Sequence, residues 1–173
     1  HIVIALQSIV SRNADPTDQI VVSVTSFETS STAFNVIPQT VVLKGTVRTL
    51  SDETRDLAEK RLEEIARKTG DVFGANVDPV YTRGYPVMTN SVDQTEFAAS
   101  VAKSVSGYCE EAPLVMGGED FSYMAIERPG AYILIGNGDS APVHNPNYNF
   151  NDEAISIGCS WWAEIIEKRM PVS

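Results

Sequence analysis

The sequence has 173 residues, of which 43% are hydrophobic and 21% are charged, as is typical of a globular protein with one or two domains. Its formal net charge of -10 argues against a nucleic-acid-binding face, which needs clustered lysine and arginine, and against an anionic membrane surface. No apolar run approaches the ~20 residues that span a bilayer.

The first half predicts a helix, two strands, a second helix and a third strand. Apolar residues recur at helical spacing over residues 1–12, but no capping residue precedes them. This pattern suggests a helix whose upstream residues have been cut off. Alternating β-branched residues predict strands over residues 20–28 and 40–49.

Ser51 is a good N-cap, and Gly70 predicts the end of a helix that runs to about Thr69. A third strand is expected over residues 75–83. One further strand before His1 would complete the βαββαβ order of a split-βαβ sandwich, in which two helices cover an antiparallel sheet.

The second half has a different character, with three helices, two short strands and a long polar loop, and we place a boundary near residues 84–90. The helices are expected over 93–105, 119–126 and 152–168, the strands over 114–116 and 131–135, and the loop over 139–151.

His144 lies in the polar loop between Pro142 and Pro146, which restrict the backbone. A neutral imidazole in a stiff loop is a good ligand for a first-row metal. A lone histidine is more often an ordinary polar residue, and a catalytic zinc ion needs about three protein ligands. The only other histidine in the chain is His1.

Gly117-Gly118-Glu119-Asp120 lies between an expected strand and an expected helix. Glycines let a backbone approach a ligand closely, and the N–H groups at a helix start can hold a carboxylate or oxyanion. A tight turn followed by two ordinary first-turn acids explains this motif equally well.

Asn35, inside an apolar run that ends in Pro38, is either a bend residue or a presented hydrogen-bonding group, and local chemistry favours the bend. Arg48, at a strand end, is interpreted as a solvated surface charge. Cys109 and Cys159 form no metal-binding spacing and indicate reduced thiols in a cytoplasmic protein, although the sequence alone leaves a disulfide open.

Several short motifs occur in order along essentially the whole chain. They are Phe34-Asn35-Val36-Ile37-Pro38, Gly45-Thr46-Val47-Arg48, Gly117-Gly118-Glu119-Asp120-Phe121-Ser122-Tyr123, Pro129-Gly130-Ala131-Tyr132, and His144-Asn145-Pro146 continuing to Phe150-Asn151-Asp152-Glu153. Together they resemble the M20 metallopeptidases, most nearly the branch of hippurate hydrolases and N-acyl-amino-acid amidohydrolases.

The resemblance implies an α/β fold made of two parts in a protein about twice this length. Residues 1–85 match a ferredoxin-like βαββαβ lid or dimerisation domain that lacks its first strand. Residues 86–173 match the C-terminal part of the catalytic domain. The family's activity implies hydrolysis of the amide bond of N-acyl amino acids by a water activated on two divalent metal ions (Zn, Mn, Co or Ni).

The resemblance also assigns roles to four residues. His144 matches the last metal ligand, Asn35 matches a lid residue that holds the substrate carboxylate across a homodimer, and Gly117 and Gly118 match a backbone turn that lines the pocket. The family's other metal ligands and its general base have no match here, so this chain alone is expected to be inactive.

Two other hypotheses compete with the amidohydrolase. A non-catalytic dimerisation or ligand-binding module, complete as it stands, would explain the missing ligands, but the uncapped first helix argues against it. A hydrolase with a serine or cysteine nucleophile is disfavoured, because the sequence has no G-x-S-x-G motif and His144 has no evident nucleophilic partner.

Overall fold

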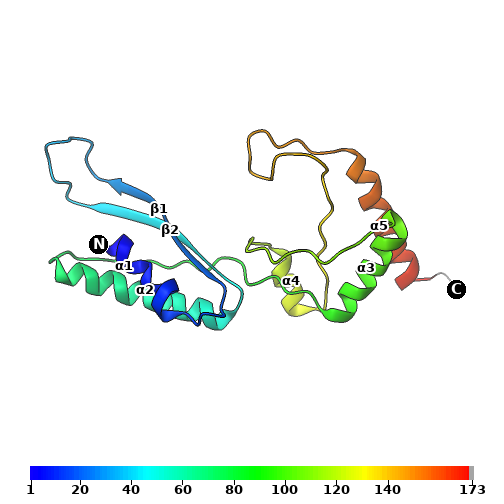
Figure 1. The fold of residues 1–173 in the computed structure, drawn as a ribbon, viewed down its shortest axis with the longest axis horizontal. Helices are drawn as coiled ribbons and strands as arrows, with labels where there is room; N and C mark the ends of the chain where they lie inside the picture. The colour runs from blue at the N-terminus through cyan, green and yellow to red at the C-terminus, as the bar shows by residue number, and fades with distance from the viewer. Residues whose placement is uncertain (172–173) are drawn as a thin grey trace. The chain divides into compact units, whose positions relative to one another are not determined.

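The computed structural model describes residues 1–171, which form two compact units (Figure 1). The first unit comprises His1–Val87 and Met116–Gly118, and the second comprises Met88–Val115 and the chain from Glu119 onward. That the first unit is a lid and the second is part of a catalytic domain stays a prediction. No helix among the described residues is both long and apolar enough to cross a membrane.

The first unit contains two short helices, a two-stranded sheet and one long helix. These elements are α1 (Ile2–Leu6), the π-helix η1 (Ile9–Asn13), β1 (Ile20–Thr29), β2 (Val41–Thr49) and α2 (Asp52–Val72). The helix expected over residues 1–12 is therefore confirmed in position, but its second half is a π-helix and not an α-helix. The hydrogen-bond pattern widens after α1, and the Ala14 N–H donates to the Ile9 carbonyl five residues earlier, at 2.9 Å.

β1 and β2 pair in antiparallel fashion, with Ile20 opposite Thr49 and Thr29 opposite Val41, which confirms both predicted strands. The register shifts at a bulge between Val24 and Ser26. Gly45 lies opposite this bulge, where a Cβ atom would come within 2.3 Å of the Ser23 carbonyl oxygen. The close approach of the two backbones therefore requires glycine at this position.

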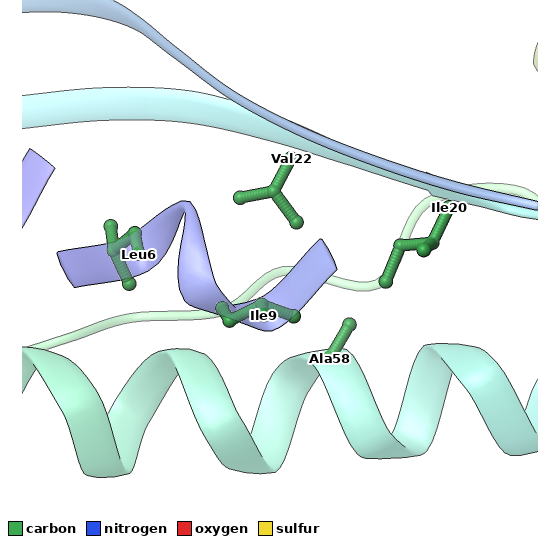
Figure 2. Packing of buried hydrophobic residues seen from close by; sticks show 5 residues of the cluster. All are labelled: Leu6, Ile9, Ile20, Val22 and Ala58. Carbon is green, nitrogen blue, oxygen red and sulfur yellow. The ribbon is translucent and has the colours of Figure 1, made fainter. Parts of the chain in front are cut away.

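The core of the first unit lies between one face of the ribbon formed by β1 and β2 and the long helix α2. Ile9, which is fully buried, lies between Val22 of β1 and Ala58 of α2 (Figure 2). Leu6 and Ile20 extend this cluster on either side. The alternation of apolar residues along β1 thus directs one side-chain row onto the helices.

α2 begins as predicted, since the Ser51 side chain accepts the Thr54 N–H at 3.1 Å. The predicted end at Gly70 is wrong, because the helix continues through this residue. Gly70 serves packing instead, as a Cβ atom there would lie 2.3 Å from Val77 Cγ2. Gly74, with a φ of +65°, takes the left-handed conformation just beyond the helix end.

The strand predicted over residues 75–83 is wrong, because the structure shows no strand there. These residues, here called the strap, run unpaired along α2, where Arg67 Nη1 donates to the Val77 carbonyl at 3.4 Å and Arg83 pairs with Asp56 at 2.6 Å. A strand needs a neighbour, and in a split-βαβ sheet that neighbour is the first strand, which is not among the described residues. The four-stranded lid stays a prediction.

The second unit is built on α3 (Val92–Ser106), α4 (Phe121–Glu127) and α5 (Glu153–Arg169), close to the predicted bounds. Its core is formed by Ala98, Val101 and Trp161, and the Trp161 indole N–H donates to the Ala98 carbonyl at 3.2 Å. The short strands predicted at 114–116 and 131–135 are wrong, because the structure shows no strand at either segment.

Candidate functional site

His144 lies in a tight turn of the long loop over residues 139–151. The Asn145 N–H donates to the Pro142 carbonyl at 3.1 Å, which makes His144 the third residue of a β-turn. Its φ is +69°, in the left-handed region that favours glycine, and among the described residues no other non-glycine residue has a positive φ. Such strain persists only where the surrounding structure enforces it, and it is concentrated at functional sites.

The base of this loop is tied by side chains that sequence analysis did not single out. The Asn137 side chain donates to the Asn149 carbonyl and accepts the Asn151 N–H, both at 2.8 Å. The Ser140 hydroxyl also donates to the Asn149 carbonyl, at 3.0 Å. The available signal was the Asn-Gly pair before the loop, because asparagine side chains commonly bond to nearby backbone in turns.

The imidazole of His144 is exposed and is a suitable metal donor, but it is a single ligand. The structure shows no group of three or more His, Cys, Asp or Glu side chains within residues 1–171 that could hold a metal ion. The residues present therefore fit a metal only as one part of its ligand set, and we derive no reaction step through a metal. Cys109 and Cys159 are free thiols.

Asn35 lies at the exposed tip of the loop between β1 and β2. The loop is closed at its base, where the Ser30 N–H donates to the Thr40 carbonyl at 3.1 Å. Asn35 is in a turn, as local chemistry favoured, and its side chain has no hydrogen bond within the described chain. The turn is therefore confirmed, and a hydrogen-bonding role for the Asn35 amide stays a prediction.

The Gly117-Gly118 turn belongs to the first unit. Arg48 is exposed, as interpreted from the sequence, and its Nη1 also donates to the Met116 carbonyl at 2.6 Å. The Tyr85 ring covers Gly118, where a Cβ atom would lie 3.0 Å from Tyr85 Cδ2. Glycine is therefore needed at Gly118 for this close approach.

The acid that follows the turn has a structural task. Glu119 Oε1 accepts the Phe121 N–H at 3.2 Å, at the start of α4. The Tyr132 hydroxyl is the main cause that holds the pKa of Glu119 below its ordinary value, and the same interaction raises the pKa of Tyr132. α4 begins at Phe121, two residues later than predicted, and is too short to support a ligand site at its N-terminus.

The candidate residues divide between the two units. Asn35, Gly117 and Gly118 lie in the first unit, and His144 lies in the second. In the second unit, an apolar hollow of about 310 Å³ lies beside the end of the long loop, lined in part by Tyr148, Phe150 and Trp162. His144 does not line it.

These features define an α/β protein with a polar turn in each unit and a strained histidine in the second. Residues 4–168 match the model of peptidase family M20/M25/M40. The chain is 34% identical over 171 residues to a hippurate hydrolase of Campylobacter jejuni, covering 96% of this chain and 44% of that protein. It is 34% identical over 154 residues to an N-acetyldiaminopimelate deacetylase of Enterococcus faecalis, covering 88% of this chain and 40% of the relative.

A solved Bacillus subtilis structure, described as a dinuclear metal-binding peptidase of the M20 family, superposes with a TM-score of 0.74 at 27% identity. That match covers 95% of this chain and 43% of the solved one. The chain therefore belongs to peptidase family M20/M25/M40 and spans less than half the length of these relatives.

Proposed function

We propose that this chain is part of a metal-dependent amidohydrolase that cleaves the amide bond of N-acyl amino acids such as hippurate. The observation that carries the proposal is the family match over residues 4–168. The names of two relatives, a hippurate hydrolase and an N-acetyldiaminopimelate deacetylase, support an N-acyl amino acid as the class of substrate. Their different acyl groups leave the preferred one to experiment.

His144 would be one ligand of a pair of divalent ions, with Zn, Mn, Co and Ni as candidates. Its fixed turn supports this role, because a ligand must be held in place before the metal arrives. The other ligands and the general base would come from residues outside those described. When bound, such ions polarise a carbonyl group and lower the pKa of a water molecule.

The first unit would contribute hydrogen-bond donors to the substrate. The exposed amide of Asn35 suits a carboxylate, and backbone N–H groups at Gly117 and Gly118 suit a carboxylate or carbonyl oxygen. Neither glycine N–H has a hydrogen-bond partner within residues 1–171. Donors left unsatisfied by the protein are available to a ligand.

The loop that carries Asn35 supports a homodimer formed through the first unit. Phe34 is 102% exposed and Ile37 is 94% exposed, so two large apolar side chains flank Asn35 without cover. Covering them against a second copy of the protein would bury apolar area and bring Asn35 to the partner's site. We propose a cytoplasmic enzyme, in keeping with its free thiols.

A second candidate is a non-catalytic dimerisation or ligand-binding module. It is favoured by the first unit, whose own residues form a buried cluster, and by the single candidate metal ligand among residues 1–171. The two candidates differ in whether residues outside this chain restore hydrolysis.

The test compares the 173-residue chain with the full-length product of its gene, here called the extended version. Both are assayed with hippurate and other N-acyl amino acids in the presence of each candidate metal. We expect hydrolysis by the extended version alone, and its loss in an extended His144→Ala variant. Equal activity in both lengths, or no activity in either, would overturn the proposal.

A further inference from the structure

We propose that Asn137 is a positioning residue for His144, because its side chain closes the long loop over residues 139–151 that carries this histidine. The inference rests on the proposed function, since the position of His144 matters only if its imidazole binds a metal ion. Asn137 acts through the loop backbone and needs no contact with the metal or the substrate.

The first observation is that the Asn137 amide joins the two ends of the loop. Its Nδ2 group donates to the Asn149 carbonyl, and its Oδ1 atom accepts the Asn151 N–H, both at 2.8 Å. A carbonyl can only accept and an N–H can only donate, so the two partners fix which way the amide points. An ionised aspartate at this position would keep the acceptor and lose the donor, whereas an alanine would lose both.

The second observation is that side chains, and not backbone pairing, hold the two arms of the loop together. Within residues 1–171, no backbone–backbone hydrogen bond joins residues 137–140 to residues 149–151. Ser140 adds a second tie, since its hydroxyl donates to the Asn149 carbonyl at 3.0 Å. Closing a loop at its base removes many of the conformations that are open to a free chain. The side chains at the base therefore limit how freely His144 moves.

The third observation is that Asn137 attaches the loop to α5. Asn151 stands just before this helix, where its carbonyl accepts the Ala154 N–H and its side chain accepts the Glu153 N–H, both at 3.0 Å. α5 is held in the core of the second unit by Trp161. The bond between Asn137 and Asn151 thus fixes the first arm of the loop to a packed helix, which positions a site more precisely than a free loop does.

The fourth observation is the strain that the loop sustains at His144. A φ of +69° at a non-glycine residue persists only where the surrounding structure enforces it. The hydrogen bond within the turn, from the Asn145 N–H to the Pro142 carbonyl, is local to the tip of the loop. Closure of the base by Asn137 limits the freedom of the tip to relax into an unstrained backbone.

The direct test is the backbone order parameter of His144 and Asn145, measured by ¹⁵N relaxation in the 173-residue chain. We expect about 0.85 in the unaltered chain and a fall below about 0.6 in Asn137→Ala. Asn137→Asp keeps the acceptor for Asn151 and is expected to fall between the two.

The matched control is Asn147→Ala, which removes the same amide from the same loop. The Asn147 side chain has no hydrogen bond within residues 1–171, and its N–H, which donates to Asn145 at 2.9 Å, is kept by alanine. This variant is expected to leave the order parameters of His144 and Asn145 unchanged.

The order parameters of α5 separate a loosened loop from a lost fold. They are expected to stay near 0.85 in Asn137→Ala, because the core around Trp161 does not include Asn137. If both Asn137 variants loosened α5 as much as the loop, Asn137 would support the whole unit, and the inference would be overturned.

The functional test measures how tightly the extended version binds each candidate metal, by equilibrium dialysis. Asn137→Ala is expected to weaken binding by about 10- to 100-fold, as is usual when a group that orients a ligand is removed. Asn147→Ala is expected to match the unaltered protein. A positioning residue acts only through the residue that it positions, so Asn137→Ala added to His144→Ala is expected to weaken binding no further.

Unchanged order parameters in Asn137→Ala, or equal losses in Asn137→Ala and Asn147→Ala, would overturn the inference. So would a further 10- to 100-fold loss of metal binding when Asn137→Ala is added to His144→Ala, because Asn137 would then act by another route. If the extended, unaltered protein binds no metal and hydrolyses nothing, the proposed function fails, and the order parameters still decide whether Asn137 holds the turn.

Discussion

The two units bury their apolar side chains to different degrees. In the first, five buried side chains from two short helices, a strand and a long helix meet in one cluster, against three in the second, which come from α3 and α5. The apolar segments of the second unit that were expected to be strands are covered only in part: Leu114 is 75% and Leu134 64% exposed, whereas Ala131 and Ile133 pack against the core. The difference teaches that helix pairs form from local pattern, whereas strands depend on a distant neighbour.

The most severe way to break this comparison is to remove buried atoms from each core. Ile9→Ala is expected to lower the free energy of unfolding of the first unit by about 2–5 kcal/mol, because Ile9 is fully buried. Val101→Ala is expected to cost the second unit roughly 1–3 kcal/mol, since fewer atoms are lost. Hydrogen exchange of the whole chain, read from proteolytic fragments of each unit, measures the free energy of unfolding of the two units separately. If either substitution lowered this free energy equally in both units, the account of two separate cores would be contradicted.

Gly70 tests how the strap packs in the first unit. Alanine in a helix interior normally stabilises by about 1 kcal/mol over glycine. Here Gly70→Ala is expected to destabilise by roughly 1–3 kcal/mol in thermal or denaturant unfolding, because the new methyl group would meet Val77.

The matched control for this change is Gly84→Ala, where a Cβ atom meets nothing within 4 Å. It is expected to gain up to about 1 kcal/mol, because alanine restricts the unfolded chain. A stabilising Gly70→Ala would show that the strap does not lie against α2.

The strained turn of the second unit gives a smaller effect of opposite sign. His144→Gly is expected to raise the free energy of unfolding by up to about 1 kcal/mol, because glycine accepts a φ of +69° without steric cost. Val143→Gly, at the adjacent position without positive φ, is expected to lower it by about 0.5–1 kcal/mol. Equal destabilisation by both changes, in thermal unfolding, would contradict backbone strain at His144.

The smallest expected effect is a change of pKa at the start of α4. Tyr132→Phe is expected to bring the pKa of Glu119 up toward its ordinary 4.5, as followed by NMR titration of the carboxyl carbon. A lowered pKa in the folded state adds stability above the unfolded value, and this stability is lost as pH falls through the folded value. Tyr132→Phe should therefore flatten the pH dependence of stability below about 4.5.

The control for this titration is Tyr108→Phe, because Tyr108 interacts with Glu110 instead. It is expected to leave the pKa of Glu119 unchanged. If the pKa of Glu119 moves equally in both variants, Tyr132 is not its main partner.

Much of the fold follows from local sequence. The Ser51 side chain caps α2 by accepting the N–H of Thr54, only three residues later. The strand β1 is recognisable from the alternation of its own residues. The helix end predicted at Gly70 was wrong, because this glycine makes room for Val77, which packs back on the helix after the chain has turned. The expected strands at 75–83, 114–116 and 131–135 failed because each would need hydrogen-bonding partners from elsewhere in a sheet.

The candidate site was predictable in part. The motif around His144 marked a loop residue, but its positive φ arises from a specific turn between Pro142 and Asn145. The hydrogen bond that Arg48 donates was not predictable, because its acceptor is a backbone carbonyl 68 residues away, which carries no mark in the sequence.

The central claim is that His144 is one ligand of a metal site completed outside this chain. The most direct measurement is divalent-metal affinity of the extended version, by equilibrium dialysis with each candidate metal. We predict two ions per chain, and binding weakened at least about 100-fold by His144→Ala but not by His1→Ala, which removes the chain's other histidine. Unchanged binding in His144→Ala, or the same loss in both variants, would contradict the account.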